Sequence, residues 1–141
     1  MASQPPTVLC VEDDPSTRQI ITKILMRLPV TPIVTAEPIE AIELARVVQP
    51  HLLLLDLMLP GMDGWEVLDR IRADSPERDL RVMVLTAKAS GPERLVATNM
   101  AQVDLFMAKP FDPLALGRDV LRLLNLSADD DVWLPRKAER S

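Results

Sequence analysis

Residues 52–64 read LLLLDLMLPGMDG. The stretch begins with four consecutive leucines, which are followed directly by the carboxylate of Asp56. Burying an unpaired charge is costly, so an aspartate at this point must lie at an edge, be paired, or bind a cation. The chain then continues through Pro60, Gly61 and Gly64, which are typical turn residues. The segment therefore predicts a buried strand that ends at a polar site.

The composition of the chain indicates one folded domain. It has 141 residues, 48% of them hydrophobic, and no apolar run long enough to span a membrane. The N-terminus lacks the charged and apolar regions of a secretory signal, and the single cysteine, Cys10, fits a reducing compartment, so we expect a cytoplasmic protein. A net charge of −5 and an aromatic content of 3% argue against direct nucleic-acid binding.

Strand-like apolar runs alternate with amphipathic helical patterns along the chain. This alternation is typical of parallel strands joined by right-handed helical crossovers, with helices on both faces of the sheet. We therefore expect a doubly wound α/β fold with a five-stranded parallel sheet. The expected strands are 7–11, 32–35, 52–55, 81–85 and 103–107, and the expected helices are 15–28, 37–48, 65–73, 91–100 and 112–124.

Polar residues follow most of the expected strands. In open parallel sheets, ligands bind outside the carboxyl ends of the strands, where these residues would meet. The first strand is followed by Glu12, Asp13 and Asp14, the second ends in Thr35 and Ala36, the third is followed by Asp56, the fourth by Thr86 and Ala87, and the fifth by Lys109.

These side chains suit a metal ion and a phosphoryl group. Carboxylates gathered at one edge repel one another unless a cation neutralises them, and oxygen ligands without histidine or cysteine favour Mg²⁺ or Mn²⁺. Lys109 can pair with a phosphoryl oxygen, and the Thr86 hydroxyl can donate a hydrogen bond to one. A carboxylate beside such an ion can act as a nucleophile toward phosphorus. The set therefore predicts an aspartyl-phosphate site centred on Asp56.

Each residue also has an ordinary structural explanation. Acids favour a helix N-terminus, so Glu12, Asp13 and Asp14 alone would indicate a solvated helix start, with Asp14 as a surface residue or a cap. Lys109 alone would be a loop lysine. Their occurrence at one edge with Asp56 is what favours the functional interpretation.

Four segments resemble the receiver domain of two-component response regulators, of the type found in the chemotaxis response regulator. The resemblance covers roughly residues 7–125 and implies a flavodoxin-like fold with strand order 2-1-3-4-5. The matching segments are VLCVEDDPSTR at 8–18, LLLLDLMLPGMDG at 52–64, VMVLTAKAS at 82–90 and FMAKPF at 106–111.

The resemblance implies a metal site and a phosphoacceptor. Glu12 and Asp13 match the acidic pair that binds Mg²⁺, with Asp13 as the direct ligand and Glu12 acting through water. Met58 matches the residue that supplies a backbone carbonyl to the metal. Asp56 matches the phosphoacceptor, which takes its phosphoryl group from a sensor histidine kinase or a phosphotransfer protein.

The resemblance also implies a conformational switch. Thr86 and Lys109 match the groups that engage the phosphoryl oxygens, and the Lys109–Pro110 bond is expected to be cis. Phe106 matches the aromatic switch position, although a simple core residue would explain it as well. Phosphorylation would remodel the face built from the fourth helix, the fifth strand and the fifth helix, which would then bind a target or form a homodimer.

Two positions depart from the family pattern. Gln102 stands where a glycine is usual, which leaves the end of the fourth helix open. Pro38 stands where the second helix usually opens with a glycine and suggests a stiffer connection. We assign residues 1–126 to the receiver domain and 127–141 to a short tail, which is either a frayed terminus or a docking segment centred on Trp133 and Leu134.

Three functions compete at this point. The first is a single-domain signalling switch without an output domain, which catalyses its own phosphorylation and dephosphorylation but is otherwise not an enzyme. The second is a Mg²⁺-dependent phosphohydrolase of the haloacid dehalogenase class, which would require a second aspartate where Met58 stands. The third is a receiver-like binding module that is not phosphorylated, against which the intact Asp56, Thr86 and Lys109 argue.

Overall fold

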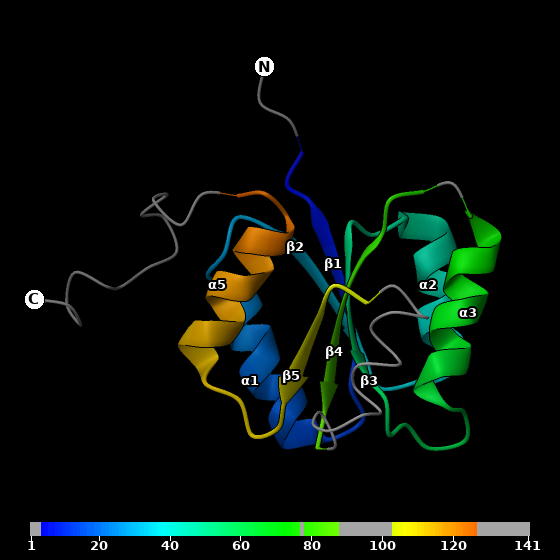
Figure 1. Cartoon of the computed structure of the whole chain (residues 1–141), viewed down its shortest axis with the longest axis horizontal. Helices are drawn as coiled ribbons and strands as arrows, with labels where there is room; N and C mark the ends of the chain where they lie inside the picture. Colours follow the sequence, from blue (N-terminus) through cyan, green and yellow to red (C-terminus); the bar gives the residue numbers. More distant parts are fainter. Residues whose placement is uncertain (1–3, 77, 88–102, 127–141) are drawn as a thin grey trace, which may run out of the picture.

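The apolar runs of the sequence pair as parallel strands in the computed structural model, which describes residues 4–76, 78–87 and 103–126 (Figure 1). Every paired strand runs parallel to its neighbour, and the order in the sheet is β2-β1-β3-β4-β5. The predicted fold and strand order are therefore confirmed. The strands are β1 (Thr7–Val11), β2 (Thr31–Thr35), β3 (Leu52–Asp56), β4 (Arg81–Thr86) and β5 (Leu105–Ala108).

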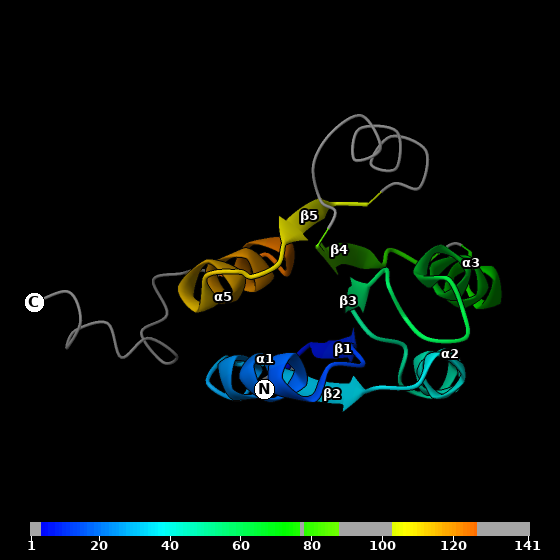
Figure 2. The same ribbon diagram turned by 90° about the horizontal axis from the view of Figure 1, so that it is seen from below.

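Helices cover both faces of the sheet. Two of them, α1 and α5, pack side by side on one face, and α2 and α3 pack together on the other (Figure 2). The described helices are α1 (Pro15–Leu25), α2 (Pro38–Val48), α3 (Gly64–Asp74) and α5 (Pro113–Leu123). None of them is long and apolar enough to cross a membrane. The expected helix 91–100, Gln102 and the tail 127–141 lie outside the described residues.

The central strand β3 explains why its sequence is apolar at successive positions. Leu53 and Leu55 pack into the core on the α2 and α3 side, whereas Leu52 and Leu54 pack into the core on the α1 and α5 side. All four side chains are fully buried. Each contributes about 1.5–3 kcal/mol to folding, so this strand holds the two layers together and fixes the position of Asp56 at its end.

Proline and aspartate define where the helices begin. Asp14 precedes α1, and its carboxylate accepts hydrogen bonds from the backbone N–H of Thr17 at 2.8 Å and from the Thr17 hydroxyl at 2.7 Å. Pro15 follows as the first helical residue, where its missing N–H costs nothing. The predicted capping role of Asp14 is confirmed.

Two boundaries differ from the sequence-based prediction. Helix α1 ends at Leu25 and not at Leu28, because the chain forms tighter turns before Pro29. Strand β5 begins at Leu105 and not at residue 103. The reason is that the backbone N–H of Val82 donates to the side-chain carboxylate of Asp104 at 2.8 Å. In a regular strand pair this N–H would donate to a backbone carbonyl of the neighbouring strand.

Candidate functional site

Three carboxylates meet at the carboxyl edge of the sheet. Strands β1 and β3 are neighbours, and Val11 pairs with Leu55, so the residues that follow lie next to each other. One oxygen from each of Glu12, Asp13 and Asp56 lies within 4.8 Å of the other two. Glu12 is 0% exposed and Asp56 is 3% exposed. The predicted acidic cluster is therefore present, and two of its members are removed from solvent.

Lys109 supplies positive charge to this cluster. Its amine Nζ lies 2.7 Å from Oε1 of Glu12 and 3.1 Å from Oδ2 of Asp56. Burial favours the neutral amine, but the hydrogen bonds to Glu12 and Asp56 outweigh it and raise the pKa of Lys109. The side chain follows β5, where the Lys109 N–H donates to the carbonyl of Thr86 at 3.1 Å and the Lys109–Pro110 bond is cis as expected.

The cluster is not fully neutralised by its protein partners. Glu12 Oε1 is buried, and the amine of Lys109 lies 2.7 Å from it. Burial raises the pKa of Glu12, which shows that its charged form is disfavoured here. Three carboxylates lie around the single charge of Lys109, and a hard divalent cation would offset the negative charge that remains. The donor set therefore fits Mg²⁺.

The remaining predicted residues lie around Asp56. Thr86 is the last residue of β4 and is 1% exposed. Met58 exposes 56% of its surface, and its backbone N–H donates to Oδ1 of Asp56 at 3.0 Å. This hydrogen bond fixes the orientation of the Asp56 carboxylate and leaves its other oxygen facing Lys109.

Phe106 lies inside the core and not at the surface. The residue is 9% exposed, and its ring centroid is 6.2 Å from that of Trp65 on α3, with an angle of 57° between the ring planes. The contact connects the strand that precedes Lys109 to the helix that follows Asp56. The ring is therefore packed in the core in this structure, and the sequence did not predict its contact with Trp65.

Arg18 was not recognised from the sequence. Its guanidinium Nη1 donates to the carbonyl oxygens of Glu12 at 3.1 Å and Asp13 at 3.0 Å. A basic residue in the second turn of a helix that follows an acidic loop is the signal that could have found it. Arg18 therefore hydrogen-bonds the backbone of two residues of the acidic cluster.

The comparisons with known proteins agree with this geometry. The response regulator receiver domain matches residues 8–120, which is most of the chain. The chain belongs to this family. A receiver domain is the phosphorylation-dependent switch of two-component signalling, so the family and the general function predicted from the sequence are confirmed.

Individual relatives support the same assignment. The DNA-binding response regulator MtrA of Mycolicibacterium smegmatis is 34% identical over 123 residues, which is 87% of this chain and 52% of MtrA. The chain therefore spans about half the length of this relative. The receiver domain of the sensor histidine kinase PA1611 of Pseudomonas aeruginosa, whose structure has a magnesium ion coordinated in the active-site cleft, is 29% identical with a TM-score of 0.75, over 86% of this chain and 98% of that domain. The chemotaxis protein CheY4 of Vibrio cholerae shares the fold at 24% identity with a TM-score of 0.77, over 84% of this chain and 98% of that protein.

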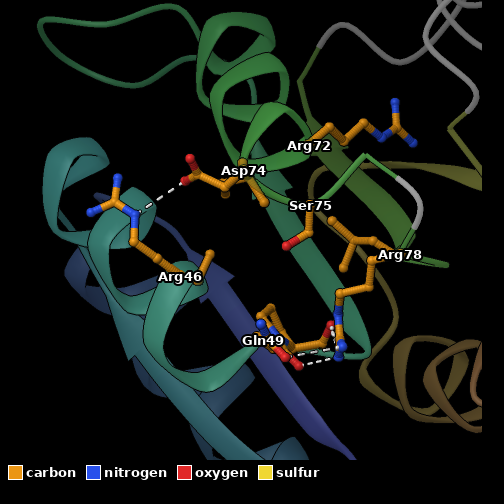
Figure 3. A pocket seen from close by; sticks show the side chains of 10 residues that line it. Arg46, Gln49, Arg72, Asp74, Ser75 and Arg78 are labelled. Atoms are coloured by element: carbon orange, nitrogen blue, oxygen red, sulfur yellow. Dashed lines mark hydrogen bonds and ion pairs between the residues drawn. The ribbon is translucent and has the colours of Figure 1, made fainter.

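A small pocket lies at the opposite edge of the sheet from the acidic cluster, where β3 and β4 begin (Figure 3). Its cavity of about 30 Å³ is far smaller than the usual ligand pocket. Arg46 pairs with Asp74 at 3.4 Å, and the guanidinium of Arg78 donates to the backbone carbonyls of Gln49 and Pro50. These contacts join α2, α3 and the loops before the strands, so we assign this end of the receiver domain a structural role.

Proposed function

We propose that Asp56 accepts a phosphoryl group from a phosphohistidine of a sensor histidine kinase or a phosphotransfer protein. The observation that supports this most strongly is the position of the Asp56 carboxylate, which lies at the end of the central strand between two further carboxylates and the amine of Lys109. A nucleophile needs such a fixed orientation, and the Met58 N–H holds one of its oxygens.

The chemistry is a single displacement at phosphorus. An oxygen of Asp56 forms a bond to phosphorus while the phosphorus–nitrogen bond breaks, and the electron pair of that bond returns to the histidine ring. Lys109 would leave Asp56 and pair with a phosphoryl oxygen, and the Thr86 hydroxyl would donate to another. Each group offsets negative charge that the transfer brings into the site.

The metal site is part of the proposal. Asp13, Asp56 and the backbone carbonyl of Met58 would bind Mg²⁺ directly, with Glu12 acting through water, and Mn²⁺ would suit the same oxygen ligands. When bound, the ion would offset the charge of the carboxylates and of the incoming phosphoryl oxygens. With these groups the receiver domain would also use small phosphodonors and hydrolyse its own aspartyl-phosphate, without being an enzyme that turns over a separate substrate.

Phosphorylation would act as a switch through Thr86 and Phe106. A shift of Thr86 toward the phosphoryl group would be coupled to a movement of the Phe106 ring, and the two states would differ in the face of β5 and α5, with the expected fourth helix lying outside the described residues. The partner of that face would be a target protein or a second copy of the chain, because a net charge of −5 disfavours nucleic acid. Its kinase partner would place the chain in the cytoplasm.

The test is intact-mass spectrometry after incubation with acetyl phosphate and Mg²⁺. We expect a gain of about 80 Da, the mass of an added HPO₃ group on a carboxylate, and no gain for Asp56→Asn or in the presence of EDTA. Asp69→Asn, an exposed aspartate on α3, is the matched control and should gain the same mass as the wild type.

A phosphoryl group on the Asp56→Asn variant would contradict the proposal. If the folded wild type gains no mass from acetyl phosphate or from a panel of phosphorylated histidine kinases, the chain acts by binding alone. The phosphohydrolase alternative is disfavoured because Met58, where that class has its second aspartate, offers an exposed thioether. Continuous release of phosphate from an added phosphomonoester would be the result that supports it.

A further inference from the structure

Arg18 makes an unusual pair of contacts at the edge of the site. It lies in the second turn of α1, and a single nitrogen of its guanidinium, Nη1, donates to the carbonyl of Glu12 at 3.1 Å and to that of Asp13 at 3.0 Å. Its own backbone N–H donates to the carbonyl of Asp14 at 2.9 Å, as expected within a helix. Arg18 therefore binds three consecutive residues of the loop that contains the acidic pair.

The two carbonyls need a donor because they fall between regular elements. The paired residues of β1 end at Val11, and the helical hydrogen bonds of α1 begin with the carbonyl of Asp14. Glu12 is fully buried, so its carbonyl is shielded from bulk water. Buried backbone groups are almost always paired, and here the partner is the Arg18 side chain.

The orientation of these two peptide groups decides where the carboxylates point. Glu12 is also bound through its N–H, which donates to the carbonyl of Thr35 at 3.0 Å, and through Oε2, which accepts from the N–H of Asp14 at 3.0 Å. Asp13 has a partly exposed side chain, and its carbonyl bond to Arg18 holds it from the helix side. Loss of that bond would free the peptide on which the Asp13 carboxylate depends.

From this geometry we infer that Arg18 is a positioning residue for the divalent cation of the site. It acts through the backbone of Glu12 and Asp13 and touches neither the cation nor the phosphoryl group. The inference rests on the proposed function, because it presupposes that the acidic cluster binds Mg²⁺. Residues that orient metal ligands typically change metal affinity by 10- to 100-fold when they are replaced.

The sign of the effect separates positioning from simple charge. A guanidinium near a Mg²⁺ site repels the cation, so if Arg18 acted only through its charge, its removal would strengthen Mg²⁺ binding. If it positions the ligands, its removal weakens Mg²⁺ binding despite the lost repulsion. The two roles therefore predict opposite changes in the dissociation constant.

The experiment measures Mg²⁺ binding by isothermal titration calorimetry for the wild type, Arg18→Met, Arg18→Lys and Arg27→Met. Arg27 is an exposed arginine just after α1 and controls for the loss of one positive charge. We expect the dissociation constant of Arg18→Met to rise at least tenfold, that of Arg18→Lys to rise less because one donor remains, and that of Arg27→Met to stay unchanged. Urea denaturation in EDTA checks that each variant is folded.

A second measurement follows the phosphorylation rate with acetyl phosphate as a function of Mg²⁺ concentration. For Arg18→Met we expect the half-saturating Mg²⁺ concentration to rise while the rate at saturating Mg²⁺ stays near that of the wild type. A general structural defect would lower the rate at every concentration and would not be rescued by Arg18→Lys.

Unchanged or tighter Mg²⁺ binding by folded Arg18→Met would overturn the inference while leaving the proposed function intact. Equal loss of affinity in Arg18→Met and Arg27→Met would also overturn it, because the effect would then not depend on the contacts that Arg18 makes with Glu12 and Asp13. Failure of the wild type itself to bind Mg²⁺ would overturn the proposed metal site and the inference together.

Discussion

At the scale of single residues, negative charge outweighs positive charge at the carboxyl edge of the sheet. Oxygens of Glu12, Asp13 and Asp56 lie within 4.8 Å of one another, and the amine of Lys109 contacts two of these residues. Like charges at such distances destabilise the folded state. A protein keeps such a destabilising cluster when its function needs it, here to bind a cation or to accept a phosphoryl group.

Asp56→Asn should therefore stabilise the protein in the absence of metal. The substitution removes one of the three neighbouring carboxylates and preserves an oxygen for the Met58 N–H. In EDTA we expect the free energy of unfolding to rise by about 1 kcal/mol, measured by urea denaturation. Saturating Mg²⁺ should reduce or reverse the difference, because it stabilises the wild-type site more strongly. A less stable Asp56→Asn variant in EDTA would contradict this prediction. It would show that the attraction between Asp56 and Lys109 stabilises the fold more than the repulsion from Glu12 and Asp13 destabilises it.

Gly64 shows that backbone space also matters for the position of Asp56. A β-carbon at this residue would lie 2.7 Å from Cα of Leu57 and 2.9 Å from the carbonyl oxygen of Asp56. Gly64→Ala would force the start of α3 away from the loop after Asp56, and we expect a loss of about 1–3 kcal/mol in the free energy of unfolding.

Gly61→Ala is the comparison for this prediction. Gly61 has a φ of 81°, but a β-carbon there would meet no atom within 4 Å. Its substitution should cost about 1 kcal/mol from backbone strain alone, and it should leave the phosphorylation rate less affected than Gly64→Ala does. Equal effects of the two substitutions on that rate would argue against a specific role for the close contact at Gly64.

At the scale of elements, the start of β5 depends on one side chain. Asp104 Oδ2 accepts the Val82 N–H at 2.8 Å, while the Asp104 N–H donates to the Val82 carbonyl at 2.9 Å. Asp104→Ala would leave the buried Val82 N–H without its acceptor. We expect a loss of about 1–3 kcal/mol, measured by urea denaturation, together with faster hydrogen exchange of the Val82 amide.

Asp104→Asn keeps an oxygen in the same place and should recover most of this loss. It removes the charge that pairs with Arg81 at 3.6 Å, but exposed pairs of this kind contribute little. If the alanine and asparagine variants proved equally unstable, the ion pair and not the bond to Val82 would be the important contact.

The same elements show what the sequence could predict. Strands with continuous apolar runs, such as β3, were predicted to within a residue because burial on both faces leaves a clear pattern. The convergence of Glu12, Asp56 and Lys109 was also predictable, since parallel strands bring their carboxyl ends to one edge. The start of β5 was predicted wrongly because a side chain replaces a backbone partner there, and the Arg18 contacts were missed because they depend on the reach of one guanidinium between elements.

At the scale of the whole molecule, the end of the sheet where the strands begin and the end where they finish have different roles. At the edge where the strands begin, the guanidinium of Arg78 donates hydrogen bonds to the backbone of the residues before β3 (Figure 3). The edge at which they end contains the buried carboxylates and the loops that follow them. A switch in this receiver domain would therefore begin at Asp56 and pass through β4 and β5, and the Phe106 ring against Trp65 lies along that route.

This arrangement makes Trp65 a reporter of the switch. The chain has two tryptophans, so Trp133→Phe leaves Trp65 as the only one. If phosphorylation moves Phe106, the surroundings of the Trp65 ring change, and we expect its fluorescence intensity or emission maximum to shift when acetyl phosphate and Mg²⁺ are added. Adding Asp56→Asn should abolish the shift, and Phe106→Leu should reduce it. A phosphorylated protein with unchanged Trp65 fluorescence would mean that Phe106 is a static core residue and that the signal leaves Asp56 by another route.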